Sequence, residues 1–471
     1  MLFNSLHFII FFPVVAFIFF SLKKVKSRQI ILLIASWYFY AAWKPEYIIL
    51  LLVSTGVDYF ASLKIASSED ERKRRTFLLL SIIINFGILF GFKYFYFFDK
   101  NIHRLLVHYN LISNIQEKRT LLLPVGISFY TFQTVSYTID VFKRRIKPEK
   151  NFVKFALFVS FFPQLVAGPI ERAGHLLPQF EKFTKPDYKR ISHGLKLMFW
   201  GFFQKIVIAD TLSLIVDEVY KNSGNYYGAD IWLATFFFAF QIYCDFSGYT
   251  DIARGAAKIL GYNLRINFKR PYFSKSFSEF WHRWHISLST WFRDYVYIPL
   301  GGSKTKSKAR FIFNIMFVFV LSGFWHGAGW TFIIWGALHG IYYLSEKFII
   351  PKMFDKKGLI NGLLRITLVF VAVNFAWIFF RSQSVRIASA LITDSFLFSK
   401  SSFNFNHFLL AKSFFFTGIV FTVSLIEQKK DIVSYISEKP LALRWSVYYL
   451  AGLIMIFLGN YGIEEFIYFR F

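Results

Sequence analysis

The stretch FIFNIMFVFVLSGFWHGAGWTFIIW, residues 311–335, decides the fold class. It is apolar over a length that a helix can use to cross a bilayer, for which about 20 residues suffice. An unpaired backbone cannot cross lipid, and the stretch lacks the alternation of a barrel strand, so it predicts a membrane helix. One ionisable side chain, His326, lies in its middle, and such groups inside membrane segments tend to be functional.

The whole chain has the composition of a membrane protein. Of its 471 residues 55% are hydrophobic and only 18% are charged, against about 25% charged in soluble domains. A soluble globular enzyme and a disordered chain are both excluded. We predict an all-α polytopic membrane protein in a single domain, residues 1–471, with roughly ten to twelve spanning helices plus re-entrant and interfacial helices. The other apolar runs cover about 3–22, 30–43, 46–63, 76–98, 120–142, 152–168, 194–219, 230–247, 363–380, 407–425 and 445–458.

The chain is strongly basic, with a formal net charge of +27. In a soluble protein this would suggest nucleic acid, but here the basic residues sit between apolar runs, so we expect no nucleic-acid partner. Basic clusters at 23–28, 71–75 and 143–147 follow the first, third and fifth runs, so they lie on one side of the membrane if each of the first five runs crosses it once. The positive-inside rule therefore places the N-terminus outside the cytoplasm. The single cysteine, Cys244, excludes a disulfide framework and a multi-cysteine metal site.

Histidine and tryptophan gather in residues 281–335, which hold six of the twelve tryptophans and three of the ten histidines. On a helix, His282 and His285 share one face, but no third ligand follows, and we predict no metal site. Arg293 and Asp294 are adjacent, so they are not expected to face each other on a helix. His326 in an apolar setting suits a general base for a hydroxyl nucleophile, and a hydrogen-bonded structural histidine fits equally well.

Two further patches interrupt apolar runs. Residues 241–251, QIYCDFSGYTD, place carboxylates and Gly248 inside one run, which predicts cavity lining or a re-entrant turn. Residues 162–172, FPQLVAGPIER, contain two prolines that would break a spanning helix. We expect a re-entrant hairpin there, with Glu171 and Arg172 at its polar end.

The motifs together resemble those of the membrane-bound O-acyltransferase (MBOAT) family. They are most similar to the bacterial alginate O-acetyltransferase (AlgI-like) branch, which is related to the D-alanyl transfer protein DltB of teichoic acid synthesis. The most specific match is FWHRWHISLSTWFRDYVYIPLGG, residues 280–302, followed by the WHG at 325–327. The other matching stretches are 1–12, 123–137, 167–180, 241–255, 323–335, 337–340 and 466–471.

The resemblance implies helices arranged around a central tunnel with two catalytic histidines. An acyl group, most simply acetyl, would pass from a cytoplasmic thioester donor, acetyl-CoA or an acyl carrier, toward a periplasmic or cell-surface polysaccharide. A periplasmic acetyltransferase partner would complete the transfer, no bound cofactor would be needed, and the protein would reside in the inner membrane. By similarity the catalytic residues are His326 and His285, and the tunnel candidates are Trp325, Trp284, Asp245, Arg293 and Asp294.

Two alternatives remain open from the sequence. D-alanyl transfer to teichoic acid uses much of the same pattern, and a non-catalytic transporter of acyl or glycan groups would need no base. The basic segments 143–150 and 303–308 would suit the phosphates of a donor, but ordinary loop charge beside membrane helices explains them as well.

Overall fold

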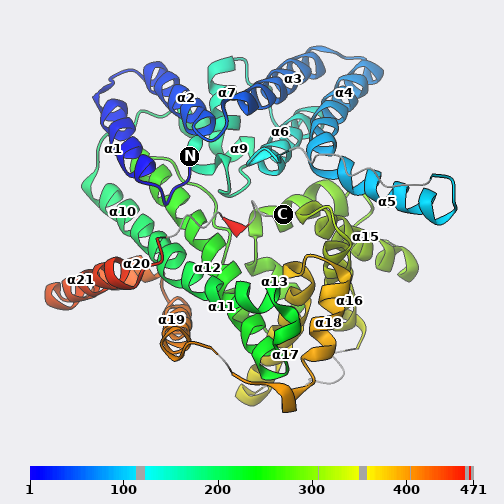
Figure 1. Ribbon diagram of the computed structural model, residues 1–471. Coiled ribbons are helices and arrows are strands. Elements are labelled where there is room, and N and C mark those ends of the chain that lie inside the picture. The colour runs from blue at the N-terminus through cyan, green and yellow to red at the C-terminus, as the bar shows by residue number, and fades with distance from the viewer. Residues whose placement is uncertain (113–121, 306, 350–357, 404, 462–465, 468–471) are drawn as a thin grey trace. The chain divides into compact units, whose positions relative to one another are not determined.

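The computed structural model describes residues 1–112, 122–305, 307–349, 358–403, 405–461 and 466–467. These residues form helices and connecting turns without a β-strand, which confirms the all-α prediction (Figure 1). Lys306 and residues 468–471, which belong to the predicted basic segment and the last matching stretch, lie outside the described residues. The chain divides into two compact units, Met1–Leu195 with Ala253–Arg265, and Lys196–Ile252 with Ile266–Phe471.

The first unit is a bundle of helices from the N-terminal part of the chain. Its helices are α1 (Leu6–Ser21), α2 (Val25–Ala41), α3 (Ile48–Ser67), α4 (Glu71–Leu89), α5 (Phe95–His108), α6 (Ile127–Phe142), α7 (Phe152–Ser160), α8 (Phe162–Leu165) and α9 (Ala173–Leu176). The fully buried carboxylate of Asp58 on α3 accepts hydrogen bonds from Asn85 on α4 at 2.9 Å and from Thr138 on α6 at 2.7 Å. Buried polar groups need such partners, so this network ties three helices together.

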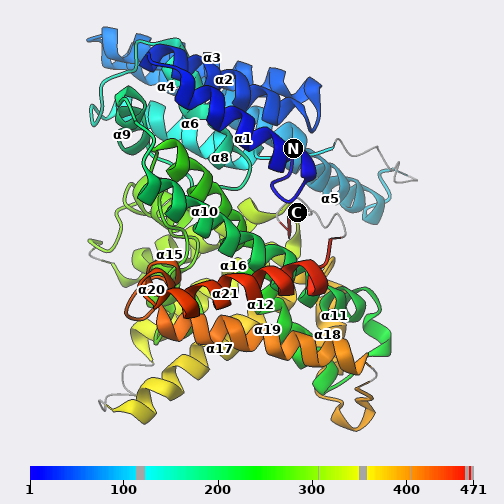
Figure 2. The same ribbon diagram turned by 90° about the vertical axis from the view of Figure 1, so that its left-hand side faces the viewer.

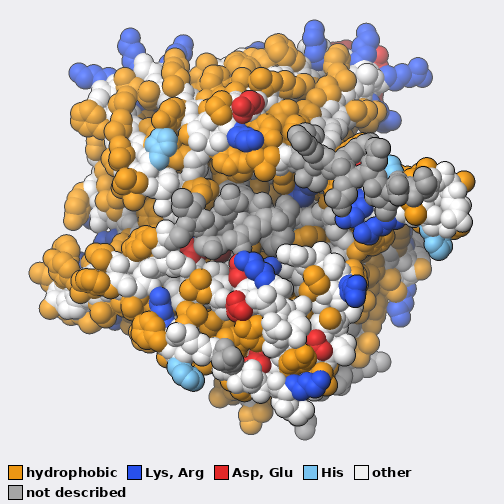
Figure 3. All heavy atoms as spheres, in the orientation of Figure 1, with side chains coloured by type: hydrophobic (Ala, Val, Ile, Leu, Met, Phe, Trp, Pro, Cys, Tyr) orange, Lys and Arg blue, Asp and Glu red, His pale blue; other side chains and the backbone are white. Residues whose placement is uncertain are grey.

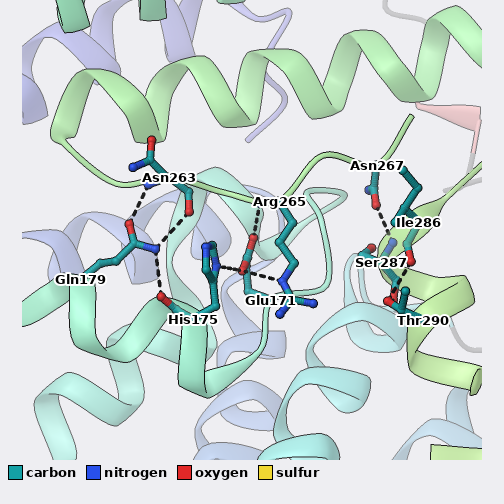
Figure 4. A network of polar contacts seen from close by, with 9 residues as sticks. All are labelled: Glu171, His175, Gln179, Asn263, Arg265, Asn267, Ile286, Ser287 and Thr290. Atoms are coloured by element: carbon teal, nitrogen blue, oxygen red, sulfur yellow. Dashed lines mark hydrogen bonds and ion pairs between the residues drawn. The ribbon is translucent and has the colours of Figure 1, made fainter. Parts of the chain in front are cut away.

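The predicted break at residues 162–172 is present, but the prediction that Glu171 and Arg172 lie at a polar end was wrong. The chain leaves α7, forms the four-residue α8 and turns into α9. Glu171 is fully buried instead of lying at a polar end, and Arg172 is buried as well. Glu171 accepts hydrogen bonds from His175 Nδ1 at 2.7 Å and from the backbone N–H of Arg265 at 2.6 Å (Figure 4). These donors compensate the desolvation of the carboxylate, which the sequence pattern could not reveal.

The second unit contains the tryptophan- and histidine-rich region. Its helices are α10 (Tyr188–Phe202, shared with the first unit), α11 (Asp210–Lys221), α12 (Ala229–Leu260, also shared), α13 (Phe277–Arg283), α14 (Ile286–Phe292), α15 (Lys308–His326), α16 (Trp330–Phe348), α17 (Leu359–Arg381), α18 (Val385–Asp394), α19 (His407–Ile426), α20 (Ile432–Ser437) and α21 (Leu441–Leu458).

Helix α12 runs unbroken through Gly248, so the re-entrant turn considered for residues 241–251 does not exist. A Cβ atom at Gly248 would lie 2.7 Å from the carbonyl oxygen of Gly201 on α10. Gly248 therefore allows α12 and α10 to pack closely and does not break α12.

Eight of the described helical segments are long and apolar enough to cross a membrane. The predicted runs at 3–22, 30–43 and 120–142 form helices of only 16 or 17 residues, which is why fewer segments meet this length than the ten to twelve runs suggested. Apolar side chains cover much of the face seen in Figure 3. None of the apolar window of α21 is buried, and Figure 2 shows this helix at the surface, as expected for a lipid-facing segment.

Candidate active site

A tight helical hairpin positions His326. Helix α15 ends at His326, and α16 begins at Trp330 after a turn of three residues. A Cβ atom at Gly323 would lie 2.2 Å from the carbonyl oxygen of Phe332, and one at Gly336 would lie 2.3 Å from that of Phe319. The two helix backbones are thus in contact, as small residues allow. The run 311–335 is a hairpin and not a single span, so His326 lies at its bend.

His285 sits in a second break, between α13 and α14. It is the residue before α14 and has a left-handed backbone with φ 42°, a conformation that costs a non-glycine residue on the order of 1–3 kcal/mol. Because α13 ends at Arg283, His282 and His285 do not share a helix face, contrary to the face considered from the sequence. His282 is exposed, and its Nδ1 bonds the carbonyl oxygen of Ser278 at 2.6 Å.

Asn267 holds the turn that presents His285. Its backbone carbonyl accepts the N–H of Ile286 at 2.9 Å, and its side-chain Oδ1 accepts the N–H of Ser287 at 3.1 Å (Figure 4). Asn267 is fully buried. The two N–H groups belong to the first turn of α14, where a helix has no internal acceptors. The sequence gave no reason to single out Asn267, because its partners are backbone groups twenty residues away.

The two histidines meet inside the second unit. Their ring centroids are 6.5 Å apart, and the residues are 2% and 6% exposed. The ring centroid of Phe246 from α12 lies 4.6 Å from that of His285, with the two rings perpendicular. The centroids of Trp335 and Phe380 lie 5.2 Å and 5.5 Å from that of His326. Burial lowers the pKa of His285, which lies outside the eight candidate spans, to about 3. His285 is therefore neutral at pH 7 and offers one donor and one acceptor nitrogen.

An aromatic layer backs the histidine pair. Trp284 is buried and packs against Phe280 and Trp377 with centroids 5.7 Å and 5.3 Å apart. Trp325 is buried as well, next to His326 in the chain. His339 lies in the same layer, 4.8 Å from the ring of Trp335. Trp284 thus belongs to the aromatic layer through its contact with Trp377, which stacks on Trp335 with centroids 5.8 Å apart.

Asp245 belongs to a separate buried cluster. Its carboxylate pairs with Lys205 at 2.7 Å, Lys205 also pairs with Asp210 at 2.8 Å, and the N–H of Ile467 donates to Asp245 at 2.7 Å. Lys205 lies in a π-helical segment, Phe203–Ala209, a distortion that often marks functional sites. Sequence reasoning missed Lys205, although a lysine well inside the apolar run 194–219 was a visible signal. Its chain neighbour Phe246 packs against the ring of His285.

Arg293 and Asp294 correct another prediction, because they do pair with each other. Arg293 Nε lies 2.8 Å from Asp294 Oδ1, and the Arg293 side chain is half-exposed. The pair opens a π-helical segment, Arg293–Tyr297, and the long guanidinium side chain reaches back to its neighbour. The ion pair is therefore a partly solvated feature of the segment after α14.

Comparison with known proteins identifies the family. Residues 76–389 match the membrane-bound O-acyltransferase family, MBOAT. The chain belongs to this family. A probable alginate O-acetylase AlgI of Pseudomonas syringae pv. tomato is 37% identical over 399 residues, 84% of this chain and 76% of the relative. A peptidoglycan O-acetyltransferase of Helicobacter pylori is 35% identical over 420 residues, 82% of this chain and 78% of the relative.

A third MBOAT relative is more distant. The teichoic acid D-alanyltransferase of Streptococcus thermophilus is 30% identical over 285 residues, 55% of this chain and 68% of the relative. Together these relatives make the protein a membrane-embedded acyltransferase.

The two buried histidines of this MBOAT protein bring imidazole nitrogens, which can accept or donate hydrogen bonds, close together. Within the described ranges, no group of three or more His, Cys, Asp or Glu side chains is arranged to hold a metal ion. His326 is the last residue of α15, where the negative end of the helix dipole stabilises an imidazolium. Neutral His285 is placed to donate a hydrogen bond nearby. A base and an oxyanion donor are the two requirements for attack of a hydroxyl on a thioester.

Proposed function

We propose that the protein transfers an acetyl group from a thioester to a hydroxyl group, with His326 as the general base. The observation that carries this proposal is the approach of the His285 and His326 rings to a 6.5 Å centroid separation inside an aromatic enclosure. Buried, water-poor surroundings strengthen electrostatic interactions and suppress hydrolysis of an activated acyl group.

The reaction would proceed through one tetrahedral intermediate. His326 removes the proton of the acceptor hydroxyl while its oxygen attacks the thioester carbonyl carbon. The N–H of neutral His285 donates to the oxyanion that forms. The carbon–sulfur bond then breaks, and the imidazolium of His326 returns the proton to the departing thiolate. Such general-base and oxyanion contributions are each worth roughly 100-fold or more in rate.

The donor, direction and acceptor form a second part of the proposal. The donor would be acetyl-CoA or an acyl carrier on the cytoplasmic side, and the N-terminus would lie outside in an inner-membrane protein. The acceptor would be a periplasmic or cell-surface polysaccharide, reached with a periplasmic acetyltransferase partner. Basic clusters at 23–28 and 71–75 support the orientation. The names of the acetylating relatives, which align over more than four fifths of this chain, support the acceptor class.

We propose acetyl and not D-alanyl as the acyl group, because the acetylating relatives align with more of this chain. The D-alanyltransferase of Streptococcus thermophilus aligns with 55% of this chain, against 84% for the alginate O-acetylase of Pseudomonas syringae. The two acyl groups share the same chemistry at His326, so they differ only in donor and product.

The test compares wild type with His326→Ala at matched membrane abundance. Base-labile acetate and D-alanine are measured on purified envelope polymers, with His282→Ala as a control because His282 is exposed and lies in the same motif. We expect acetate to disappear in His326→Ala and to persist in the control. Persistence of acetate in both variants would reject His326 as the base and favour a transporter. Loss of D-alanine instead would assign the acyl group to the rival.

A further inference from the structure

A cavity of about 390 Å³ lies in the second unit, lined by none of the histidines. It opens where the residues before α13 meet the last turn of α16 and the first turns of α17. The side chains used below are Lys275, Ser278, Glu346, Lys347, Arg365 and Val369.

Basic side chains dominate this cavity. Lys275, Lys347 and Arg365 line the cavity together with one carboxylate, Glu346, whose Oε2 accepts the backbone N–H of Ser278 at 3.0 Å. Glu279, which accepts the backbone N–H of Lys275 at 2.6 Å, is already paired with Arg283 at 2.5 Å. Lys275 and Lys347 are exposed, and within the described part of the chain neither ammonium is in an ion pair. The cavity therefore carries an excess of positive charge that a bound anion would balance.

The Lys275 ammonium also borders the start of a membrane helix. A Cβ atom at Gly362, in the first turn of α17, would lie 3.6 Å from Lys275 Nζ. Arg365 follows Gly362 by three residues, so both positions occupy neighbouring places on one helix face. The positive charges thus surround the N-terminal end of a candidate span, Leu359–Arg381.

The other face of this helix end is strongly apolar and open. Leu359 and Ile360 are 82% and 75% exposed, and Leu363 and Leu364 are more than half exposed. On a membrane helix such side chains face lipid acyl chains. A cationic cavity directly beside a lipid-facing surface matches the two parts of a phospholipid, and basic pockets between membrane helices bind acidic headgroups.

We propose that this cavity binds the phosphate of an anionic phospholipid headgroup, with the acyl chains lying along the exposed face of α17. The proposal does not depend on acyl transfer. It does have a consequence for the site, because α13 leads from the cavity to Trp284 and His285. Phe277 of α13 stacks on Tyr342 of α16 at 5.1 Å, so a bound headgroup would brace α13 against α16.

The test measures lipid binding directly. The full-length protein is placed in nanodiscs of phosphatidylcholine alone, or of phosphatidylcholine and phosphatidylglycerol in equal parts. Retained phosphatidylglycerol is counted by native mass spectrometry, and thermal unfolding is followed in parallel. The variant is Lys275→Gln with Lys347→Gln. The matched control is Lys23→Gln with Lys24→Gln, which removes the same charge from two exposed positions that do not line the cavity.

Phosphatidylglycerol should raise the unfolding temperature of wild type and of the control. In the cavity variant the affinity should fall on the order of thirtyfold, because each basic side chain contributes roughly fivefold. An equal loss of affinity in the control would show that the lipid is held by general electrostatic attraction to the protein surface, and would overturn the proposed site. A further arm adds inorganic phosphate to phosphatidylcholine nanodiscs. A shift there that needs Lys275 and Lys347 would mean a soluble phosphate ligand and would overturn the lipid assignment.

Discussion

Replacement of Asn267 by leucine should disable the site while leaving the fold in place. Leucine has a similar size but offers no oxygen to the N–H of Ser287, which now donates to Asn267 Oδ1 at 3.1 Å. The backbone bond from Ile286 to the carbonyl of residue 267 can persist, because any residue supplies it. We call the two hydrogen bonds from Asn267 to the turn at His285 the clamp. The variant therefore removes only the side-chain bond of this clamp and leaves the backbone bond.

The magnitude follows from two costs that act in the same direction. An unpaired N–H at the buried Ser287 costs about 1–3 kcal/mol. The left-handed backbone of His285 stores a similar amount, on the order of 1–3 kcal/mol. Without the clamp, both costs are relieved when the turn relaxes, which moves the imidazole. A displacement of about 1 Å at a reacting centre can cost roughly 100-fold in rate.

The assay is acetyl transfer in membrane vesicles supplied with an acetyl thioester. We expect kcat to fall about 100-fold in Asn267→Leu with KM little changed, since the clamp acts on His285 and not on donor binding. Asn267→Asp keeps an oxygen acceptor and should restore most of the rate. The control is Asn314→Leu, which removes a buried asparagine with bonds to the carbonyls of Leu300 and Gly302, about 18 Å along α15 from His326.

The clamp argument would be refuted by wild-type kcat in Asn267→Leu at equal protein abundance. It would also be refuted if Asn314→Leu lowered kcat as much, because the effect would then be general destabilisation.

Three further outcomes are expected. Gly323→Ala should abolish activity and reduce membrane yield, because its Cβ would collide with the α16 backbone, whereas Gly418→Ala, with open space around it, should be neutral in both assays. Lys205→Met should lower the unfolding temperature sharply, since two buried carboxylates lose their cation at a cost of about 3–5 kcal/mol; an unchanged melting curve would contradict the buried pairing. His285→Gln should slow transfer yet keep the pH dependence between about pH 5 and 8, because the pKa of His285 is already lowered to about 3. A change in the shape of the pH–rate profile between about pH 5 and 8 would show that His285 titrates during turnover.

The helical class and the burial of His326 were predictable because their signals are local, whereas His285 lies outside the apolar runs and was singled out by the family resemblance. Long apolar runs fix membrane helices, and a histidine inside an apolar run stands out whatever the fold. The bend at His326 was not predicted, because residues 311–335 also fitted one continuous membrane helix. Only the contact of Gly323 and Gly336 with facing carbonyls shows a hairpin.

The rest of the site depends on partners that no sequence pattern specifies. Asp245 looked like a cavity residue, but Lys205 and the N–H of Ile467 engage it, and Ile467 lies 222 positions away in the chain. Glu171 was expected at a polar end because charged residues usually are. Hydrogen bonds donated by His175 and Arg265 compensate the cost of burying this carboxylate. Such long-range compensation is decided by tertiary structure.

The most direct measurement of the central claim uses purified protein in sealed proteoliposomes. Radiolabelled acetyl thioester is supplied on the side that carries the basic loops, and ester-linked label is measured on a polysaccharide acceptor on the other side. Any partner protein that proves necessary is added equally to all samples. We predict that wild type forms the base-labile acetyl ester and that His326→Ala, folded and inserted to the same extent, forms none. Equal ester formation by both proteins would contradict the assignment of His326 as the base of an acetyl transfer.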